Sequence, residues 1–234
     1  MNVYVWTNTM KNAYIWEYIP RQPWANTLAY YPLTSSTTTS DMKWSWTAYN
    51  LTNNWVSFGT YAGVSCAYFP NSTAWSDTNY WLYTTAFWMS TDMTVSLRFY
   101  QISFPNTHSC QFQFWTGTRN YVLWTWINSS WDVCLWAWQS ANESIVIWKG
   151  TYQWEWHYMT VTKSWTNFTL FIDKEQITTL SFSNAVPQRF NLWAQPVDRS
   201  DLYGYLSEVI VETVAWDADR ISDYYNYTKA NYWL

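Results

Sequence analysis

In the stretch Met93-Thr-Val-Ser-Leu-Arg-Phe-Tyr100, apolar and polar side chains alternate, and this pattern indicates the fold class. A period of two residues is the pattern of a β-strand with one apolar face. The stretch Phe168-Thr-Leu-Phe-Ile-Asp173 places Phe168, Leu170 and Ile172 on one face in the same way. Both stretches therefore predict strands whose apolar faces pack into a core.

Similar short strands are predicted along most of the chain, separated by clusters of Asn, Ser, Asp and Pro. They cover residues 28–31, 111–115, 121–127, 131–138, 145–148, 156–162, 177–182 and 206–211. This pattern predicts an all-β fold, a two-sheet antiparallel sandwich. The predicted core includes Val95, Leu97, Phe168, Leu170, Ile172, Leu206, Val209 and Val211. Leu206 and Val209 both face inward only if a β-bulge lies between them.

One segment near the C-terminus has the pattern of a helix. Asp217 is a good N-cap residue, and Asp219 adds a negative charge in the first turn. Ile221 and Tyr225 then lie four residues apart on one face. We predict one short helix over residues 217–225.

The N-terminal stretch is predicted to be an appendage. Residues 3–8 and 13–18 resemble each other as two short strands, and Pro20 and Pro23 break the pattern after them. We predict that residues 1–24 form a strand pair and linker, and that the main domain covers residues 25–234.

Charge excludes some partners. The net charge is −4 with 12 Lys and Arg residues, so no basic patch is expected and nucleic acid is not a predicted partner. No stretch approaches the roughly 18 apolar residues that a membrane span needs, and no leader peptide is visible at the start. With 12% charged residues, the composition is typical of extracellular β-proteins. We expect an extracellular, cell-surface or virion location.

Three cysteines, Cys66, Cys110 and Cys134, match no metal-binding spacing, and their odd number leaves at least one thiol unpaired within the chain. We expect them to be small buried apolar residues.

Tryptophan and glycine occur in unusual amounts, 22 and 5, against roughly 16 glycines expected at ordinary usage of about 7%. Trp44, Trp46, Trp55 and Trp165 stand in Ser-, Asn- and Asp-flanked turns, where glycine is usual. Two interpretations remain open. The rings form an exposed binding surface, or a codon read as glycine by the source organism, such as UGA, has been rendered as tryptophan.

Four ordered pieces between residues 25 and 227 resemble the laminin G-like branch of the concanavalin A-like lectin and glucanase superfamily. The first is Leu28-Ala-Tyr-Tyr-Pro-Leu33, followed by Asp41 and Lys43-Trp-Ser-Trp46. The second joins Trp156-His-Tyr-Met-Thr-Val-Thr162 to Phe168-Thr-Leu-Phe-Ile-Asp173, with Lys174 where the family has glycine. The third is Tyr203-Gly-Tyr-Leu-Ser-Glu-Val-Ile-Val211, and the fourth is the helix after Trp216.

This resemblance implies a jelly-roll sandwich with a rim of loops that binds a glycan or a protein surface. It also implies that five tryptophans stand at glycine positions of the family, whereas Trp156 and Trp216 stand where a large apolar residue is usual. The five are Trp44, Trp46, Trp55, Trp165 and Trp193.

The superfamily includes glycoside hydrolases, and the retaining ones need two carboxyl groups about 5 to 5.5 Å apart. No Glu-x-Asp-x-Glu pattern occurs, and Glu208 and Glu212 would lie about 13 Å apart on a regular strand. His108, expected in a loop, and His157, expected at a strand start, complete no triad or zinc motif. No catalytic residue is therefore predicted.

Calcium is the one candidate cofactor, because oxygen ligands at a sandwich rim suit it. The candidate ligands are Asp198 and Asp201, and the alternative is a solvated turn in which Arg199 pairs with them.

The leading hypothesis is a non-catalytic adhesion module that binds carbohydrate or a protein surface through its rim loops. The alternative is a structural or assembly module of a surface or viral appendage. A polysaccharide-degrading enzyme ranks third.

Overall fold

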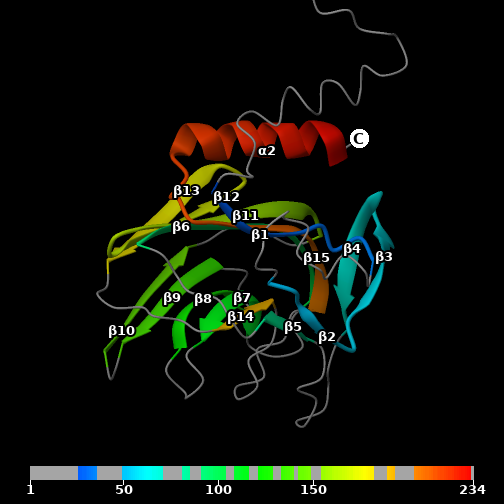
Figure 1. Ribbon diagram of the computed structural model, residues 1–234, viewed down its shortest axis with the longest axis horizontal. Coiled ribbons are helices and arrows are strands. Elements are labelled where there is room, and N and C mark those ends of the chain that lie inside the picture. Colours follow the sequence, from blue (N-terminus) through cyan, green and yellow to red (C-terminus); the bar gives the residue numbers. More distant parts are fainter. Residues whose placement is uncertain are drawn as a thin grey trace, which may run out of the picture.

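The computed structural model describes residues 26–35, 49–70, 81–84, 91–103, 108–115, 121–128, 133–139, 142–148, 154–181, 189–192 and 203–232. In these ranges two antiparallel sheets lie face to face, and one helix lies on the outer side of one sheet (Figure 1). The predicted sandwich with one C-terminal helix is confirmed. The predicted strand pair and linker of residues 1–24 lie outside the described residues.

Sheet A, the sheet beneath the helix in Figure 1, has the order β13-β12-β11-β6-β15-β4-β3. β1 pairs with the last residues of β15, whereas β4 pairs with its first part. The strands of sheet A are β1 (Thr27–Tyr31), β3 (Ser57–Tyr61), β4 (Val64–Phe69), β6 (Asp92–Ser103), β11 (Trp156–Ser164), β12 (Asn167–Ile172), β13 (Glu175–Ser181) and β15 (Tyr203–Glu212).

Sheet B faces it with the order β10-β9-β8-β7-β14-β5-β2. Its strands are β2 (Thr52–Asn54), β5 (Trp81–Thr84), β7 (His108–Trp115), β8 (Tyr121–Asn128), β9 (Val133–Gln139), β10 (Asn142–Trp148) and β14 (Arg189–Leu192). His108 begins β7, so its predicted place in a loop is wrong, because the strand starts three residues earlier than the apolar pattern does.

The core lies between the sheets and includes every residue that the alternation predicts. Val95, Leu97, Phe168, Leu170, Ile172, Leu206, Val209 and Val211 are all buried in one cluster. The predicted bulge is also present. The pairing of β15 with β6 shifts between Ser207 and Val209, and Glu208 between them has a φ of 48°. This extra residue lets Leu206 and Val209 both face inward.

The polar face of β6 differs from the expectation for a half-buried strand. Thr94, Ser96 and Arg98 are buried, as are the apolar residues between them. The cause is α2 (Ala218–Tyr232), which covers this part of the outer face of sheet A (Figure 1). The helix continues seven residues beyond the predicted end, and Asp217 caps it as predicted, since its Oδ1 accepts a bond of 2.8 Å from the Arg220 N–H.

Candidate binding surface

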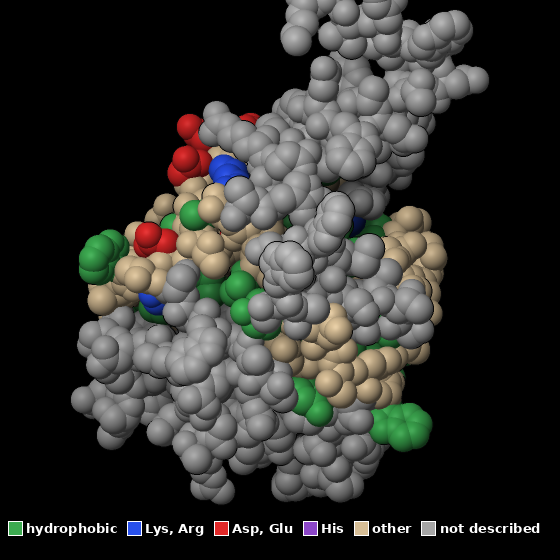
Figure 2. Space-filling model, viewed as in Figure 1, with side chains coloured by type: hydrophobic (Ala, Val, Ile, Leu, Met, Phe, Trp, Pro, Cys, Tyr) green, Lys and Arg blue, Asp and Glu red, His purple; other side chains and the backbone are tan. Residues whose placement is uncertain are grey.

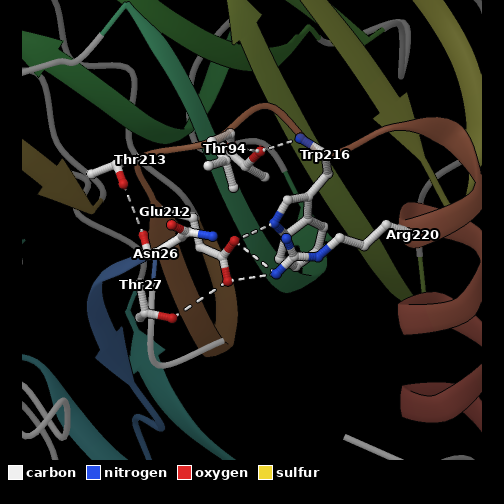
Figure 3. Close-up of polar contacts among 8 residues, drawn as sticks. Asn26, Thr27, Thr94, Glu212, Thr213, Trp216 and Arg220 are labelled. Atoms are coloured by element: carbon white, nitrogen blue, oxygen red, sulfur yellow. Dashed lines mark hydrogen bonds and ion pairs between the residues drawn. The ribbon is translucent and has the colours of Figure 1, made fainter. Parts of the chain in front are cut away.

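Two carboxylates of β15 fasten α2 to sheet A. The Glu212 carboxylate accepts a bond of 2.6 Å from the Trp216 indole N–H and lies 2.7 Å from the Arg220 guanidinium (Figure 3). The guanidinium also lies over the Trp216 ring, 4.5 Å from its centroid. Thr94 Oγ1 accepts a hydrogen bond of 2.9 Å from the Trp216 backbone N–H. The start of the helix is therefore held to β6 and β15 by buried, directional contacts.

Glu208 makes a second attachment further along the helix. Its carboxylate accepts bonds from the hydroxyls of Tyr224, at 2.7 Å, and Tyr30, at 3.5 Å. Burial raises the pKa of Glu208, while these hydroxyls and the Arg98 charge oppose the rise. Glu208 and Glu212 thus hold the helix, and their partners are side chains of this chain rather than an open cleft.

His157 lies at the start of β11, as predicted. Its Nδ1 is 2.6 Å from Asp173 Oδ2, and the other oxygen of Asp173 accepts the Tyr158 N–H at 2.8 Å. Asp173 lies in the β12–β13 turn, where it and Lys174 both have positive φ, 55° and 91°. This pattern is that of a type I′ hairpin turn. The His157–Asp173 pair therefore has a structural role, because it holds the β12–β13 turn against β11.

The calcium prediction stays untested, since Asp198 and Asp201 lie outside the described residues. Within the described ranges, no group of three or more His, Cys, Asp or Glu side chains could hold a metal ion. No helix there is long and apolar enough to cross a membrane.

Beyond the helix, the outer face of sheet A carries three half-buried tyrosines, which we call the tyrosine surface: Tyr61 of β3, Tyr68 of β4 and Tyr205 of β15. The rings of Tyr61 and Tyr205 stack with centroids 4.1 Å apart and 13° between their planes. Tyr68 follows, 5.0 Å from Tyr205. Three neighbouring strands therefore present a row of aromatic rings on a rigid sheet.

A buried layer supports this row. Tyr100 receives a hydrogen bond of 3.2 Å from the Tyr61 hydroxyl and packs edge-on against Trp156. Arg98 lies 5.2 Å from the centroid of the Trp156 ring. Burial raises the pKa of Tyr100 to about 12 and also raises the pKa of Tyr205. Tyr205 therefore stays protonated at neutral pH, and its half-buried side chain offers an uncharged hydroxyl to a ligand.

Cys66 lies beneath the same row and is buried and in no disulfide, which confirms the prediction for this residue. Burial raises the pKa of its thiol to about 11. The side chains of Cys110 and Cys134 lie outside the described residues.

Gly204 sets the close approach of β15 and β6 next to Tyr205. A Cβ at this position would lie 2.1 Å from the Tyr100 carbonyl oxygen, a distance at which the strands would have to separate. The motif Tyr203-Gly-Tyr205 was the only sequence signal for this surface, and it did not indicate binding. Tyr61 and Tyr68 could not be selected from the sequence, because 20 tyrosines occur in the chain and only the sheet order brings these two beside Tyr205.

The exposed large hydrophobic residues in the described part of the chain are Trp55, Trp154 and Trp165, at 76%, 59% and 74% exposure. They lie in separate turns or strand ends. On the face shown in Figure 2, the hydrophobic side chains of the described residues likewise form small separate groups. Trp44, Trp46 and Trp193 lie outside the described residues. The described tryptophans thus do not form one continuous aromatic patch.

No family model and no curated protein matches this sequence. Solved structures do resemble the fold. The receptor-binding domain of botulinum neurotoxin type G has a TM-score of 0.62 and 9% identity, over 87% of this chain and 51% of that one.

Two further structures match similarly. A type C botulinum neurotoxin, whose cell entry is described as dependent on two ganglioside molecules, has a TM-score of 0.66 and 11% identity, over 87% of this chain and 51% of that one. The binding domain of botulinum neurotoxin DC in complex with SialylT has the same four values. This chain thus spans about half the length of these structures, and identities this low show a shared β-sandwich fold alone.

Proposed function

We propose that this chain is a non-catalytic recognition module that binds carbohydrate through the tyrosine surface. The observation that carries the proposal is the row Tyr61, Tyr205 and Tyr68, half-exposed on three adjacent strands and held by ring stacking. Tyrosine offers an apolar ring for sugar C–H faces and a hydroxyl for hydrogen bonds. Because the rings already contact one another, ligand binding would immobilise few side chains.

One further finding supports a carbohydrate ligand. The fold resembles botulinum neurotoxin structures whose descriptions include two ganglioside molecules and SialylT. The tyrosine surface lies on strands, whereas the sequence favoured the rim loops as the binding site. Most of those loops lie outside the described residues. The three side chains of the tyrosine surface are themselves uncharged, which suits a ligand recognised by stacking and hydroxyl contacts.

The test is a glycan array probed with the wild-type chain and with Tyr61→Ala and Tyr68→Ala variants. Both variants are expected to bind the glycan about fivefold more weakly, because the loss of a ring contact worth roughly 1 kcal/mol changes the affinity by about that factor. Tyr227→Ala is the matched control, since Tyr227 is a half-buried tyrosine on α2. Melting temperatures of all three variants show whether the fold is retained.

Three other outcomes would contradict the proposal or part of it. A glycan signal that survives both tyrosine variants would place the site elsewhere and overturn the tyrosine surface. The absence of any glycan signal would favour a structural or assembly module. Release of reducing sugar from a bound glycan would contradict the non-catalytic assignment.

A further inference from the structure

We infer that residues 55, 154 and 165 are glycine in the protein that the source organism makes, and that tryptophan stands there because a codon read as glycine has been rendered as tryptophan. The inference is independent of the proposed carbohydrate site, whose three surface residues are all tyrosines. It decides which aromatic rings of this sequence are available to a ligand.

The backbone provides the first observation. Trp55, Trp154 and Trp165 have φ angles of 59°, 66° and 54°. Only a few per cent of non-glycine residues have positive φ, and for a bulky residue the conformation is an outlier. Glycine adopts it without a steric penalty, because it has no Cβ.

The local turns specify glycine more narrowly. Trp165 and Thr166 form the two-residue loop between Ser164 and Asn167, which pair with each other. Trp165 is the first of the two and the one with positive φ, the position that glycine occupies in a type II′ hairpin. In the β2–β3 turn, the Asn53 side chain bonds both the N–H and the carbonyl of Val56. Trp55 is the third residue of that turn, where a positive φ calls for glycine or Asn.

Trp154 is a position that the sequence pattern did not single out. It precedes β11, and its N–H donates to the Gln101 carbonyl at 3.4 Å, which fixes the backbone before the strand. The residue two places later, Trp156, is 6% exposed and belongs to the layer beneath the tyrosine surface. Trp154 is therefore exposed and Trp156 is buried, although only one residue separates them.

Exposure provides the second observation. The three exposed tryptophans all have positive φ, whereas Trp156 and Trp216 are buried and do not. Positive φ alone is not diagnostic, since Leu33 and Lys174 also have it. The coincidence of an exposed ring and a left-handed backbone separates these three tryptophans from the other residues, and at Trp55 and Trp165 the turn itself calls for glycine.

The first test is the gene. We expect UGA at codons 55, 154 and 165 and UGG at codons 156 and 216, and UGG at the first three would overturn the inference. Peptide mass spectrometry of the protein from its own cells gives the same answer directly. The tryptic peptide of residues 150–163 carries positions 154 and 156 together, so glycine at 154 and tryptophan at 156 are expected in one spectrum.

The second test is stability of the expressed chain. The triple variant Trp55→Gly, Trp154→Gly and Trp165→Gly is expected to melt several degrees higher than the parent and to associate less. The matched triple alanine variant removes the same rings but keeps a Cβ at each positive φ. It should lose self-association equally while melting a few degrees below the glycine variant.

Failure here is distinguishable from failure of the carbohydrate proposal. A glycine variant that melts no higher than the alanine variant would overturn the inference, whatever the glycan array shows. A glycine variant that loses glycan binding would likewise overturn it, because the exposed tryptophans would then be ligand contacts.

Discussion

Glu208 has two structural roles, one in the backbone of β15 and one in the attachment of α2. It is the bulge residue of β15, and its buried carboxylate accepts the Tyr224 hydroxyl of α2. Burial raises its pKa above the ordinary value of 4.5, so the folded chain binds the proton more tightly than the unfolded chain does. The free energy of unfolding then falls as the pH rises from 4.5 through the folded pKa.

A Glu208→Gln variant tests this titration, because glutamine keeps an oxygen for Tyr224 but cannot ionise. We expect the stability of the variant relative to wild type to increase between pH 4.5 and pH 8. Urea unfolding at both pH values measures it. Glu212, whose pKa burial also raises, is present in both proteins, so its contribution cancels. Identical pH profiles would show that Glu208 does not titrate as its burial implies.

At the level of elements, α2 changes the character of sheet A. Ile221 of the helix and Trp216, which precedes the helix, pack with Phe171 and Ile210 on the outer face of the sheet. Strands that would otherwise have one solvated face are therefore buried on both. A face covered in this way cannot bind a ligand. The tyrosine surface lies on strands of sheet A beyond the helix, β3, β4 and the first part of β15.

The N-cap is the contact of α2 most easily tested. Asp217→Ala removes the acceptor of the Arg220 N–H and is expected to lower the free energy of unfolding by about 1 kcal/mol. Asp217→Asn should retain most of this stability, because asparagine is an equally good cap. Asp223→Ala, at an exposed position of the same helix, is the control. Chemical denaturation of the three variants measures the effect, and equal losses for Ala and Asn at position 217 would contradict it.

In the whole molecule, one core joins the two sheets. Leu97 and Leu170 come from sheet A, and Phe112 and Leu135 from sheet B pack in the same buried cluster. Burial from both sides leaves little room for relaxation after a side chain is shortened.

Leu97→Ala and Leu170→Ala are therefore each expected to lower the free energy of unfolding by about 2 to 5 kcal/mol. Gln176→Ala, at an exposed position of β13, should change it by less than about 0.5 kcal/mol. Thermal or urea unfolding provides the measurement. A loss below about 0.5 kcal/mol at either leucine would mean that the side chain does not face the core.

Features that depend on local periodicity and capping could be predicted from the sequence. Alternation placed Leu97 and Leu170 in the core, the spacing of Leu206 and Val209 required the bulge, and Asp217 marked the start of the helix. These features depend on residues that are neighbours in the chain, so their physical causes can be read from the sequence.

Features that depend on residues distant in the chain became visible only in the folded molecule. The burial of Thr94, Ser96 and Arg98 follows from a helix more than 100 positions away, and the tyrosine surface exists because β3 and β4 lie beside β15. Strand order cannot be read from periodicity, since every strand has the same period of two residues. The left-handed conformation of Trp154 likewise depends on the path of the chain into β11, and no neighbouring residue type indicated it.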